Sequence, residues 1–254
     1  MMEGILYKYL DAEGGAAMLY NKNLMFTNAT QLNDPFDCHQ NLIDFSNSRT
    51  PRVLVFDETV LVPQEVKWCE SARDKTWICS LSKVYDSLLM WAFYGNNHQG
   101  MCIGIDMVKA KQYLDKMDGF FNGCLSFEVQ YRNIQNRPDY YSDKEDYFTY
   151  QFATKAREWA HEQEVRLVTI DPSPKYMKLM PGQNDEKGPV DWRKVHAFTD
   201  LEGECFASLY FGVNMERSKR DKIIGFAKQV NPYIIKYQME PDPKAFKLTR
   251  RIIY

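Results

Sequence analysis

The sequence predicts an α+β protein with a strand-rich core, and three observations lead to this fold class. Its 254 residues are 44% hydrophobic and 26% charged, the ordinary composition of a globular chain. Strand-like stretches outnumber helix-like ones. The two kinds do not alternate strictly, as a doubly wound sheet requires. Because no repeat or flexible linker divides the chain, we expect a single domain over residues 1–254, with one or two mixed sheets flanked by helices.

The expected strands are short runs rich in β-branched and aromatic residues, with turn residues at their ends. They are Ile5–Tyr9, Leu24–Thr27, Arg52–Phe56, Trp77–Leu81, Met101–Asp106, Leu125–Tyr131, Val165–Ile170, Ala207–Gly212, Tyr233–Tyr237 and Phe246–Tyr254. Prolines and glycines punctuate residues 171–198, so this segment is expected to form a loop or a mobile hairpin.

The expected helices carry apolar residues three and four positions apart. They are Gly15–Asn23, Leu61–Asp74, Asp86–Tyr94, Val108–Met117, Lys144–His161 and Glu216–Gln229. Asp106 and Asp143 precede two of these helices and are the short polar residues that begin helices.

Composition narrows the function classes. A formal charge of -2 gives no reason to expect nucleic acid or an anionic membrane as the default partner. The six cysteines form no C-x-x-C pair and no early apolar run reaches signal-peptide length, which indicates a cytoplasmic protein with buried thiols. The common dinucleotide, P-loop, serine-hydrolase and zincin motifs are missing, and no metal-binding residues are expected from the four histidines.

Three clusters concentrate polar residues among aromatic ones. The first is the run from Asn33 to Asp37, in which Asn33 or Asp34 can bond its own backbone ahead of Pro35. A well-formed turn explains this cluster as well as a binding site does.

The second cluster runs from Leu89 to Gly100. Trp91 and Tyr94 are three residues apart and share a helical face, and the following Gly95 and Asn96 end the helix and carry His98 into a loop. A core face with a surface histidine is the structural alternative. Polar residues gathered at a helix exit are, however, free to meet a ligand.

The third cluster runs from Lys155 to Arg166. Lys155, Trp159 and Glu162 are predicted to share one helical face. Alternation along the next strand points Glu164 and Arg166 to the same side, so they can form one charged site. A solvated helix end with local ion pairs is the alternative.

In this order, the three clusters resemble the bacterial family catalogued as domain of unknown function 2971 (DUF2971). The resemblance runs from Leu6 to Gly212 and includes Leu6-Tyr7-Lys8-Tyr9, the Asn33–Asp37 turn, Ser80-Leu81-Ser82, Met90-Trp91, Tyr94, His98-x-Gly100 and Trp159-x-x-Glu162-x-Glu164-x-Arg166. It implies a more distant similarity to the ADP-ribosyltransferase superfamily. The implied activity is transfer of ADP-ribose from NAD to a protein or nucleic-acid acceptor, and the genomic setting of the family suggests phage defence.

The resemblance also implies roles for individual residues. Glu164 is the expected catalytic carboxylate, Glu162 completes the pair, and Tyr94 and His98 assist them. The expected NAD contacts are Lys8, Tyr9, Asn33, Asp34, Ser80, Trp91 and Arg166. Such enzymes often carry Arg or His where Lys8 or Tyr9 stands here. An anionic side chain suits the positive charge that develops on ribose when the bond to nicotinamide breaks.

Two other function classes stay open. Asp34, Asp37, Glu162 and Glu164 could converge on Mg²⁺ in a nuclease or phosphoesterase. Alternatively, Trp91, Tyr94 and Trp159 could form a recognition groove in a protein that is not an enzyme. Basic residues also gather between Arg217 and Lys222 and at Arg250-Arg251. Glu216 and Asp221 interleave the first group, which indicates an ordinary helix surface. The alternative is a nucleic-acid-binding face, which an acceptor of DNA or RNA would require.

Overall fold

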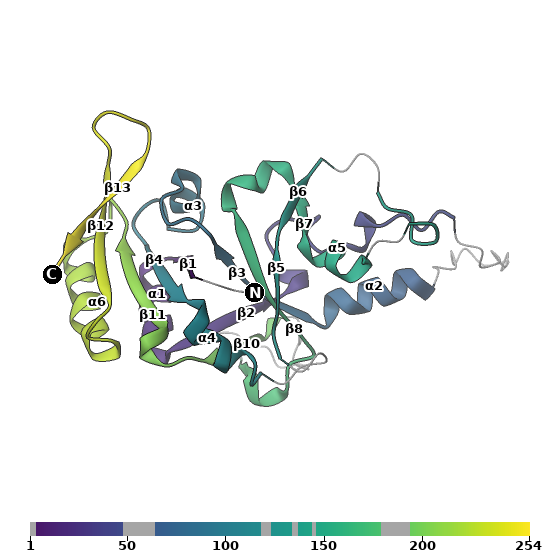
Figure 1. The fold of residues 1–254 in the computed structure, drawn as a ribbon, viewed down its shortest axis with the longest axis horizontal. Coiled ribbons are helices and arrows are strands. Elements are labelled where there is room, and N and C mark those ends of the chain that lie inside the picture. Colours follow the sequence, from purple (N-terminus) through teal and green to yellow (C-terminus); the bar gives the residue numbers. More distant parts are fainter. Residues whose placement is uncertain (1–3, 48–63, 118–122, 134–136, 144–145, 179–193) are drawn as a thin grey trace, which may run out of the picture.

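The computed structural model describes residues 4–47, 64–117, 123–133, 137–143, 146–178 and 194–254 (Figure 1). An 11-stranded mixed sheet forms its centre, which confirms the expected α+β class. Along the main path of this sheet the order is β13 (Leu248–Ile253), β12 (Ile235–Pro241), β11 (Phe206–Phe211), β4 (Met101–Asp106), β1 (Ile5–Leu10), β3 (Thr76–Ser82), β2 (Asn23–Asn28), β10 (His196–Asp200) and β9 (Met177–Lys178). Among the described strands of this sheet, only β11 and β12 pair in parallel.

The sheet branches at β3. One edge of β3 pairs along its whole length with β8 (Glu164–Ile170), which in turn pairs with β5 (Leu125–Glu128). The other edge pairs with two strands: β2 meets Trp77 and Ile78, whereas β1 meets only Ser82. Residues 79–81 therefore lie between two diverging strands and have no paired strand on that edge in these registers.

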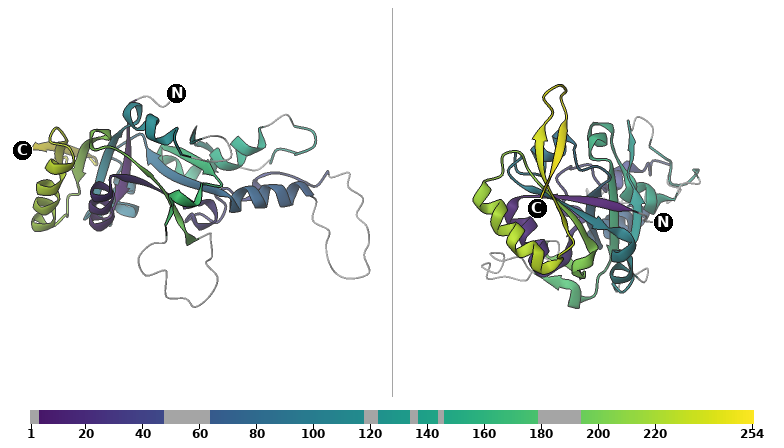
Figure 2. Two further views of the ribbon diagram at one scale, coloured as in Figure 1. Left: turned by 90° about the horizontal axis from the view of Figure 1, so that it is seen from below. Right: turned by 60° about the vertical axis from the view of Figure 1, so that its left-hand side comes forward.

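Helices cover the sheet from several sides. α1 (Ala12–Asn21) and α6 (Arg217–Val230) pack against each other at the end of the molecule formed by β11, β12 and β13 (Figure 2). α4 (Met107–Leu114) begins at Asp106, whose carboxylate accepts hydrogen bonds from two backbone N–H groups, as expected. α3 (Leu88–Phe93) follows β3, and α2 (Gln64–Asp74) extends from the opposite end (Figure 1).

The main hydrophobic core lies between the sheet and α1, α4 and α6. Its fully buried side chains include Leu19, Leu24, Phe26, Met101, Ile103, Ile105, Phe206, Leu209 and Phe211. Burial of each such side chain stabilises the fold by about 1.5–3 kcal/mol. This core holds β1 and β4 in place, and so it fixes the strand that forms one wall of the candidate site described below.

The prediction of one long helix over Lys144–His161 is wrong. That helix is replaced by α5 (Tyr147–Ala153), β7 (Thr154–Ala156) and the 3-10 helix η3 (Arg157–Glu162). The N-cap of α5 is Asp146 rather than Asp143. β7 pairs in parallel with β6 (Gln130–Arg132), and this tertiary pairing overrides the helical periodicity of the sequence.

Other differences are smaller. The expected strand Leu125–Tyr131 divides into β5 and β6 at Val129, whose N–H bonds to the Glu164 carbonyl. Within residues 171–198, β9 and β10 pair in antiparallel fashion, so the described ends of this segment form a hairpin. The expected strand Arg52–Phe56 lies outside the described residues. Each remaining expected element is present, with ends shifted by a few residues. None of the helices in the described ranges is long and apolar enough to span a bilayer.

Candidate functional site

A cavity of about 260 Å³ opens where β1 and β2 diverge beside β3. We call it the β3 cavity. Seven of the residues predicted from the sequence line it: Lys8, Tyr9, Asn33, Ser80, Tyr94, Glu162 and Glu164. They come from β1, the turn after β2, β3, the end of α3, η3 and the start of β8. Side chains from the beginning, middle and later part of the chain therefore meet around one hollow.

Arg166 lies behind this cavity and is fully buried. Its guanidinium binds both carboxylate oxygens of Glu164, at 3.0 and 3.1 Å, and both oxygens of Asp37, at 2.8 and 2.6 Å. A further N–H bonds to the Phe152 carbonyl at 2.9 Å. Glu164 and Arg166 do share one face of β8, as strand alternation predicts.

Lys155 bridges the three carboxylates. Its ammonium lies 2.6 Å from Oε2 of Glu162, 3.6 Å from Glu164 and 3.7 Å from Asp37. It also lies 4.8 Å from the centre of the Trp159 ring, within range of a cation–π contact. The sequence correctly grouped Lys155, Trp159 and Glu162, although a strand and a 3-10 helix bring them together rather than one helical face.

Tyr94 connects this charged network to the turn after β2. Its hydroxyl donates a 2.6 Å hydrogen bond to Oε1 of Glu162 and accepts one of 3.1 Å from the Asn33 side chain. The turn itself forms as expected, because Oδ1 of Asp34 accepts from the Phe36 N–H. Asn33 therefore reaches the cavity through a locally determined backbone shape.

The two glutamates have opposite electrostatic environments. Burial would raise the pKa of Glu164, but the adjacent Arg166 and Lys155 lower it to about 2. For Glu162 burial dominates, and the repulsion from Glu164 adds to it, so its pKa is raised despite Lys155. A carboxylate pair of this kind provides one permanent anion and one group that can exchange a proton.

Lys8 supplies the positive charge on the opposite wall. Its ammonium donates to the Ser80 carbonyl at 2.9 Å, on the edge of β3 that no strand covers. No carboxylate of the described residues lies within ion-pair distance of Lys8. The Lys8 ammonium therefore keeps donors for a ligand anion.

Four of the predicted site residues lie elsewhere. Arg166 has no exposed surface and its donors bind protein groups, so it cannot hold a diphosphate. Trp91 is fully buried against Tyr9, with its indole N–H on the Tyr85 carbonyl, so it cannot stack on a ligand. Asp34 lines a different cavity, discussed below.

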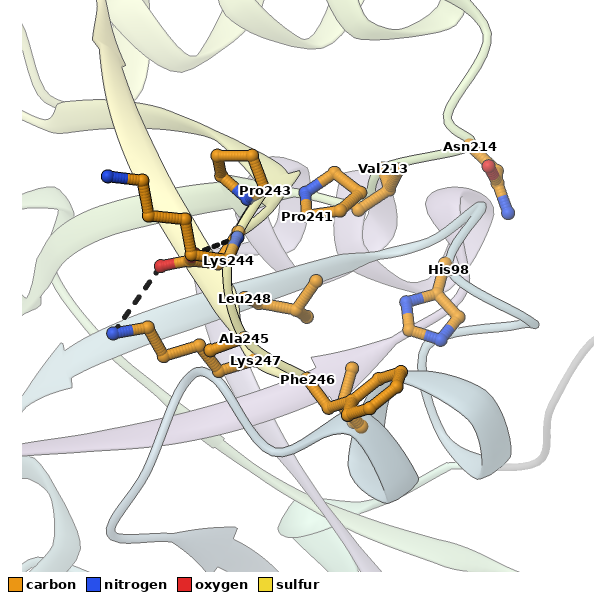
Figure 3. Close-up of a pocket in the computed structure, with 12 residues that line it drawn as sticks. His98, Val213, Asn214, Pro241, Pro243, Lys244, Ala245, Phe246, Lys247 and Leu248 are labelled. Atoms are coloured by element: carbon orange, nitrogen blue, oxygen red, sulfur yellow. Dashed lines mark hydrogen bonds and ion pairs between the residues drawn. The ribbon is translucent and has the colours of Figure 1, made fainter.

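His98 is also outside the β3 cavity. It stacks against Trp91 and lines a cavity of about 650 Å³ beside the turn between β12 and β13, which we call the hairpin cavity (Figure 3). Asn96, Asn97 and His98 all have left-handed backbone conformations, which turn the chain away from the end of α3. The proximity of His98 to Tyr94 in sequence therefore does not bring it to the glutamates.

Lys155, Asp37 and Tyr131 are members of the site that the sequence did not assign to NAD chemistry. Asp37 and Lys155 line the β3 cavity, and the Tyr131 hydroxyl accepts from the Glu164 N–H at 2.8 Å. Asp37 was predicted only as a possible magnesium ligand. No signal in the sequence marks Tyr131, because its contact depends on how β6 and β8 lie in space.

The carboxylates do not present free oxygens to a cation in the way the magnesium alternative requires. Arg166 occupies Asp37 and Glu164, and Lys155 occupies Glu162. Asp34 points instead to its own turn. Within the described ranges, no group of three or more His, Cys, Asp or Glu residues is arranged to hold a metal ion.

The fold and this cavity define an α+β protein with a buried ion-pair network at a small polar hollow. Residues 90–167 match the model of the family described as "Protein of unknown function (DUF2971)", the family that the sequence motifs indicated. The matched segment supplies Tyr94, Lys155, Glu162, Glu164 and Arg166, whereas Lys8 and the turn after β2 lie before it. Neither the curated proteins nor the solved structures contain a match to the chain.

Proposed function

We propose that the β3 cavity is the active site of an enzyme that transfers ADP-ribose from NAD to an acceptor. The observation that carries this proposal is the meeting of Glu162, Glu164 and Tyr94 with Lys8 across one cavity. A carboxylate held anionic inside a protein stabilises positive charge that develops on a nearby ribose. The low pKa of Glu164 keeps it ionised near neutral pH.

The size of the cavity fits part of the donor. Ligand pockets commonly measure about 300–1,000 Å³, so 260 Å³ suits the nicotinamide and its ribose rather than a whole dinucleotide. Tyr9 and Tyr94 provide aromatic surface for the planar ring. Lys8 lies where it can bind the first phosphate beyond the ribose by a charge-assisted hydrogen bond.

The two glutamates divide the chemical work in this proposal. The bond between ribose C1′ and the nicotinamide nitrogen breaks, and nicotinamide leaves as a neutral base. The oxygens of Glu164 stay bonded to Arg166, and the negative charge of this carboxylate stabilises the cationic sugar through space. The acceptor oxygen or nitrogen forms the new bond to C1′. Its proton goes to Glu162, whose raised pKa suits a general base. Tyr94 and Lys155 fix the orientation of Glu162.

The test is release of nicotinamide from NAD, and transfer of labelled ADP-ribose to cell lysate or nucleic acid. We expect Glu162→Gln to reduce transfer by about 100-fold, within the range for loss of a general base. Lys244→Ala, at the exposed turn between β12 and β13, is the matched control and should be fully active. Equal transfer by the wild type and Glu162→Gln, or none by the folded wild type, would contradict the proposal.

A further inference from the structure

A third cavity, of about 540 Å³, lies on the other side of the ion pair that closes the β3 cavity. Asp37 and Lys155 line both cavities, so their side chains form a shared wall. We call this the Phe36 cavity, because Phe36 stands in it with 71% of its surface exposed. Its volume lies within the usual range for small-molecule sites.

Phe36 is exposed because of the turn that carries it. Asp34 Oδ1 and the Asp34 carbonyl bond to the N–H groups of Phe36 and Asp37, which directs Asp37 inward to Arg166. The ring of Phe36 is left outside the hydrophobic core. An aromatic face held outward by a rigid turn is a surface on which a planar group can stack.

Arg132 and Arg137 supply positive charge to the same cavity. Arg132 lies over the Tyr150 ring at 5.2 Å, and Arg137 donates to the Asn41 carbonyl at 3.1 Å. Neither forms an ion pair with a carboxylate of the described residues, although Arg137 is close enough to contribute to the lowered pKa of Asp44. Within the described part of the chain, these contacts leave each guanidinium with donors that suit phosphate oxygens.

Carboxylates also line this cavity. Asp34 and Glu158 both face this cavity, so its charges are mixed rather than uniformly positive. Burial lowers the pKa of His39, which keeps its ring neutral near pH 7. A bare anion would gain little from such a lining. A ligand with an anionic end, a planar end and N–H or O–H donors would use all of it.

We propose that the Phe36 cavity binds a nucleoside monophosphate group, with its base against Phe36 and its phosphate on Arg132 and Arg137. The exposed carboxylate of Glu158 accepts hydrogen bonds from the base or the ribose. Two sources share this chemistry: the adenylate half of NAD, which the β3 cavity is too small to hold, and a nucleotide of a single-stranded acceptor. The assignment to either source rests on the proposed function, whereas binding of the nucleotide does not.

The experiment is calorimetric titration of the whole protein with adenosine 5′-monophosphate. We expect binding that weakens at least about tenfold in Arg132→Ala/Arg137→Ala, since hydrogen bonds to charged groups contribute this much. Phe36→Ala should weaken it by a similar factor through lost stacking. Lys244→Ala/Lys247→Ala is the control and should bind as the wild type does. All these side chains are exposed, and thermal melting checks that the variants fold.

Two further titrations identify the source. If the adenylate of NAD occupies the cavity, NAD binding weakens in Arg132→Ala/Arg137→Ala and a single-stranded oligonucleotide does not compete with the monophosphate. If an acceptor strand occupies it, the oligonucleotide competes and NAD binding is unchanged. Absence of monophosphate binding, or equal binding by wild type, Phe36→Ala and Arg132→Ala/Arg137→Ala, overturns the inference. Nicotinamide release that depends on Glu162 would still support the proposed function in that case.

Discussion

The hydroxyl of Tyr94 donates a 2.6 Å hydrogen bond to Oε1 of Glu162 and thereby joins the end of α3 to the segment that begins β8. Oε2 of the same carboxylate binds Lys155. Both oxygens of Glu162 are therefore held, one by a neutral donor and one by a cation. The neutral donor is the contact that a single substitution can remove without leaving a buried charge unpaired.

We predict that Tyr94→Phe raises the pKa of Glu162 further. In the wild type the hydrogen bond from Tyr94 favours the ionised carboxylate, and the variant lacks it. As the pH is lowered, activity that needs ionised Glu162 would therefore begin to fall at a higher pH in the variant than in the wild type. The pH profile of nicotinamide release measures this shift. Tyr233→Phe is the control, since the Tyr233 ring is almost fully exposed. Identical acidic limbs for wild type and Tyr94→Phe would show that Tyr94 does not act on the essential group.

A second prediction concerns stability. Arg166→Met removes the nearer of the two cations that face buried Asp37 and Glu164 and leaves only the ammonium of Lys155, at 3.7 and 3.6 Å. Removal of one partner from a buried pair costs about 3–5 kcal/mol. Denaturant unfolding measures this loss. Arg251→Met is the control, because the pair of Arg251 with Glu240 is exposed and contributes at most about 1 kcal/mol. Arg166→Lys keeps the charge but not the two-pronged geometry, so it should fall between them.

Similar free energies of unfolding for Arg166→Met and Arg251→Met would contradict this account. That result would mean that water reaches Asp37 and Glu164 when the guanidinium is removed. The two carboxylates would then be solvated rather than buried.

The pH dependence of stability should show two opposing contributions. The pKa of Glu164 is lowered from 4.5 to about 2 in the folded state. Its contribution to stability is therefore present above about pH 4.5 and is lost as the pH falls toward 2. The pKa of Glu162 is raised, so the folded state binds its proton more tightly. The contribution of Glu162 to stability is present below about pH 4.5 and is lost as the pH rises through the pKa that Glu162 has in the folded state.

Glu162→Gln removes only the second contribution. Between pH 4.5 and 7, its free energy of unfolding should therefore increase relative to that of the wild type as pH rises. Urea unfolding at several pH values measures the difference. A constant difference across this range would show that Glu162 titrates in the folded protein as it does in the unfolded chain.

Local patterns predicted much of this architecture. Strands such as β4 and β8 combine apolar content with clear turn residues, and Asp106 begins α4 where the sequence placed it. The shared face of Glu164 and Arg166 follows from alternation alone. These features depend on neighbours within a few residues, which is why a single sequence reveals them.

The errors have a different physical origin. Residues after Ala153 leave the helix because β7 pairs with β6, a strand more than 20 positions earlier in the chain. Trp91 and Arg166 have the chemistry of ligand-binding residues, but long-range packing buries them completely. His98 follows Tyr94 by four residues, yet the left-handed turn between them sends it to the hairpin cavity. Sequence spacing could not reveal these long-range arrangements.

The last prediction concerns the loop that carries His98 to the hairpin cavity. A Cβ at Gly100 would lie 2.2 Å from the Leu10 carbonyl oxygen and 2.9 Å from that of Gly95, and both are backbone atoms that cannot move aside alone. The Gly100 carbonyl also accepts from the Gly212 N–H and so joins the loop to the end of β11. Gly100→Ala should destabilise the fold by about 2–3 kcal/mol, near the upper end for overpacking.

Gly225 provides the matched control, because a Cβ added there meets nothing within 4 Å and the residue lies inside α6. Gly225→Ala should stabilise the protein by about 0.5–1 kcal/mol through its helical preference alone. Thermal and urea unfolding of the two variants should therefore shift in opposite directions. If Gly100→Ala unfolds at the wild-type midpoint, the loop can move away from Leu10 and is not closely packed there. The opposite signs at the two glycines thus test whether the backbone at Gly100 packs directly against Leu10 and Gly95.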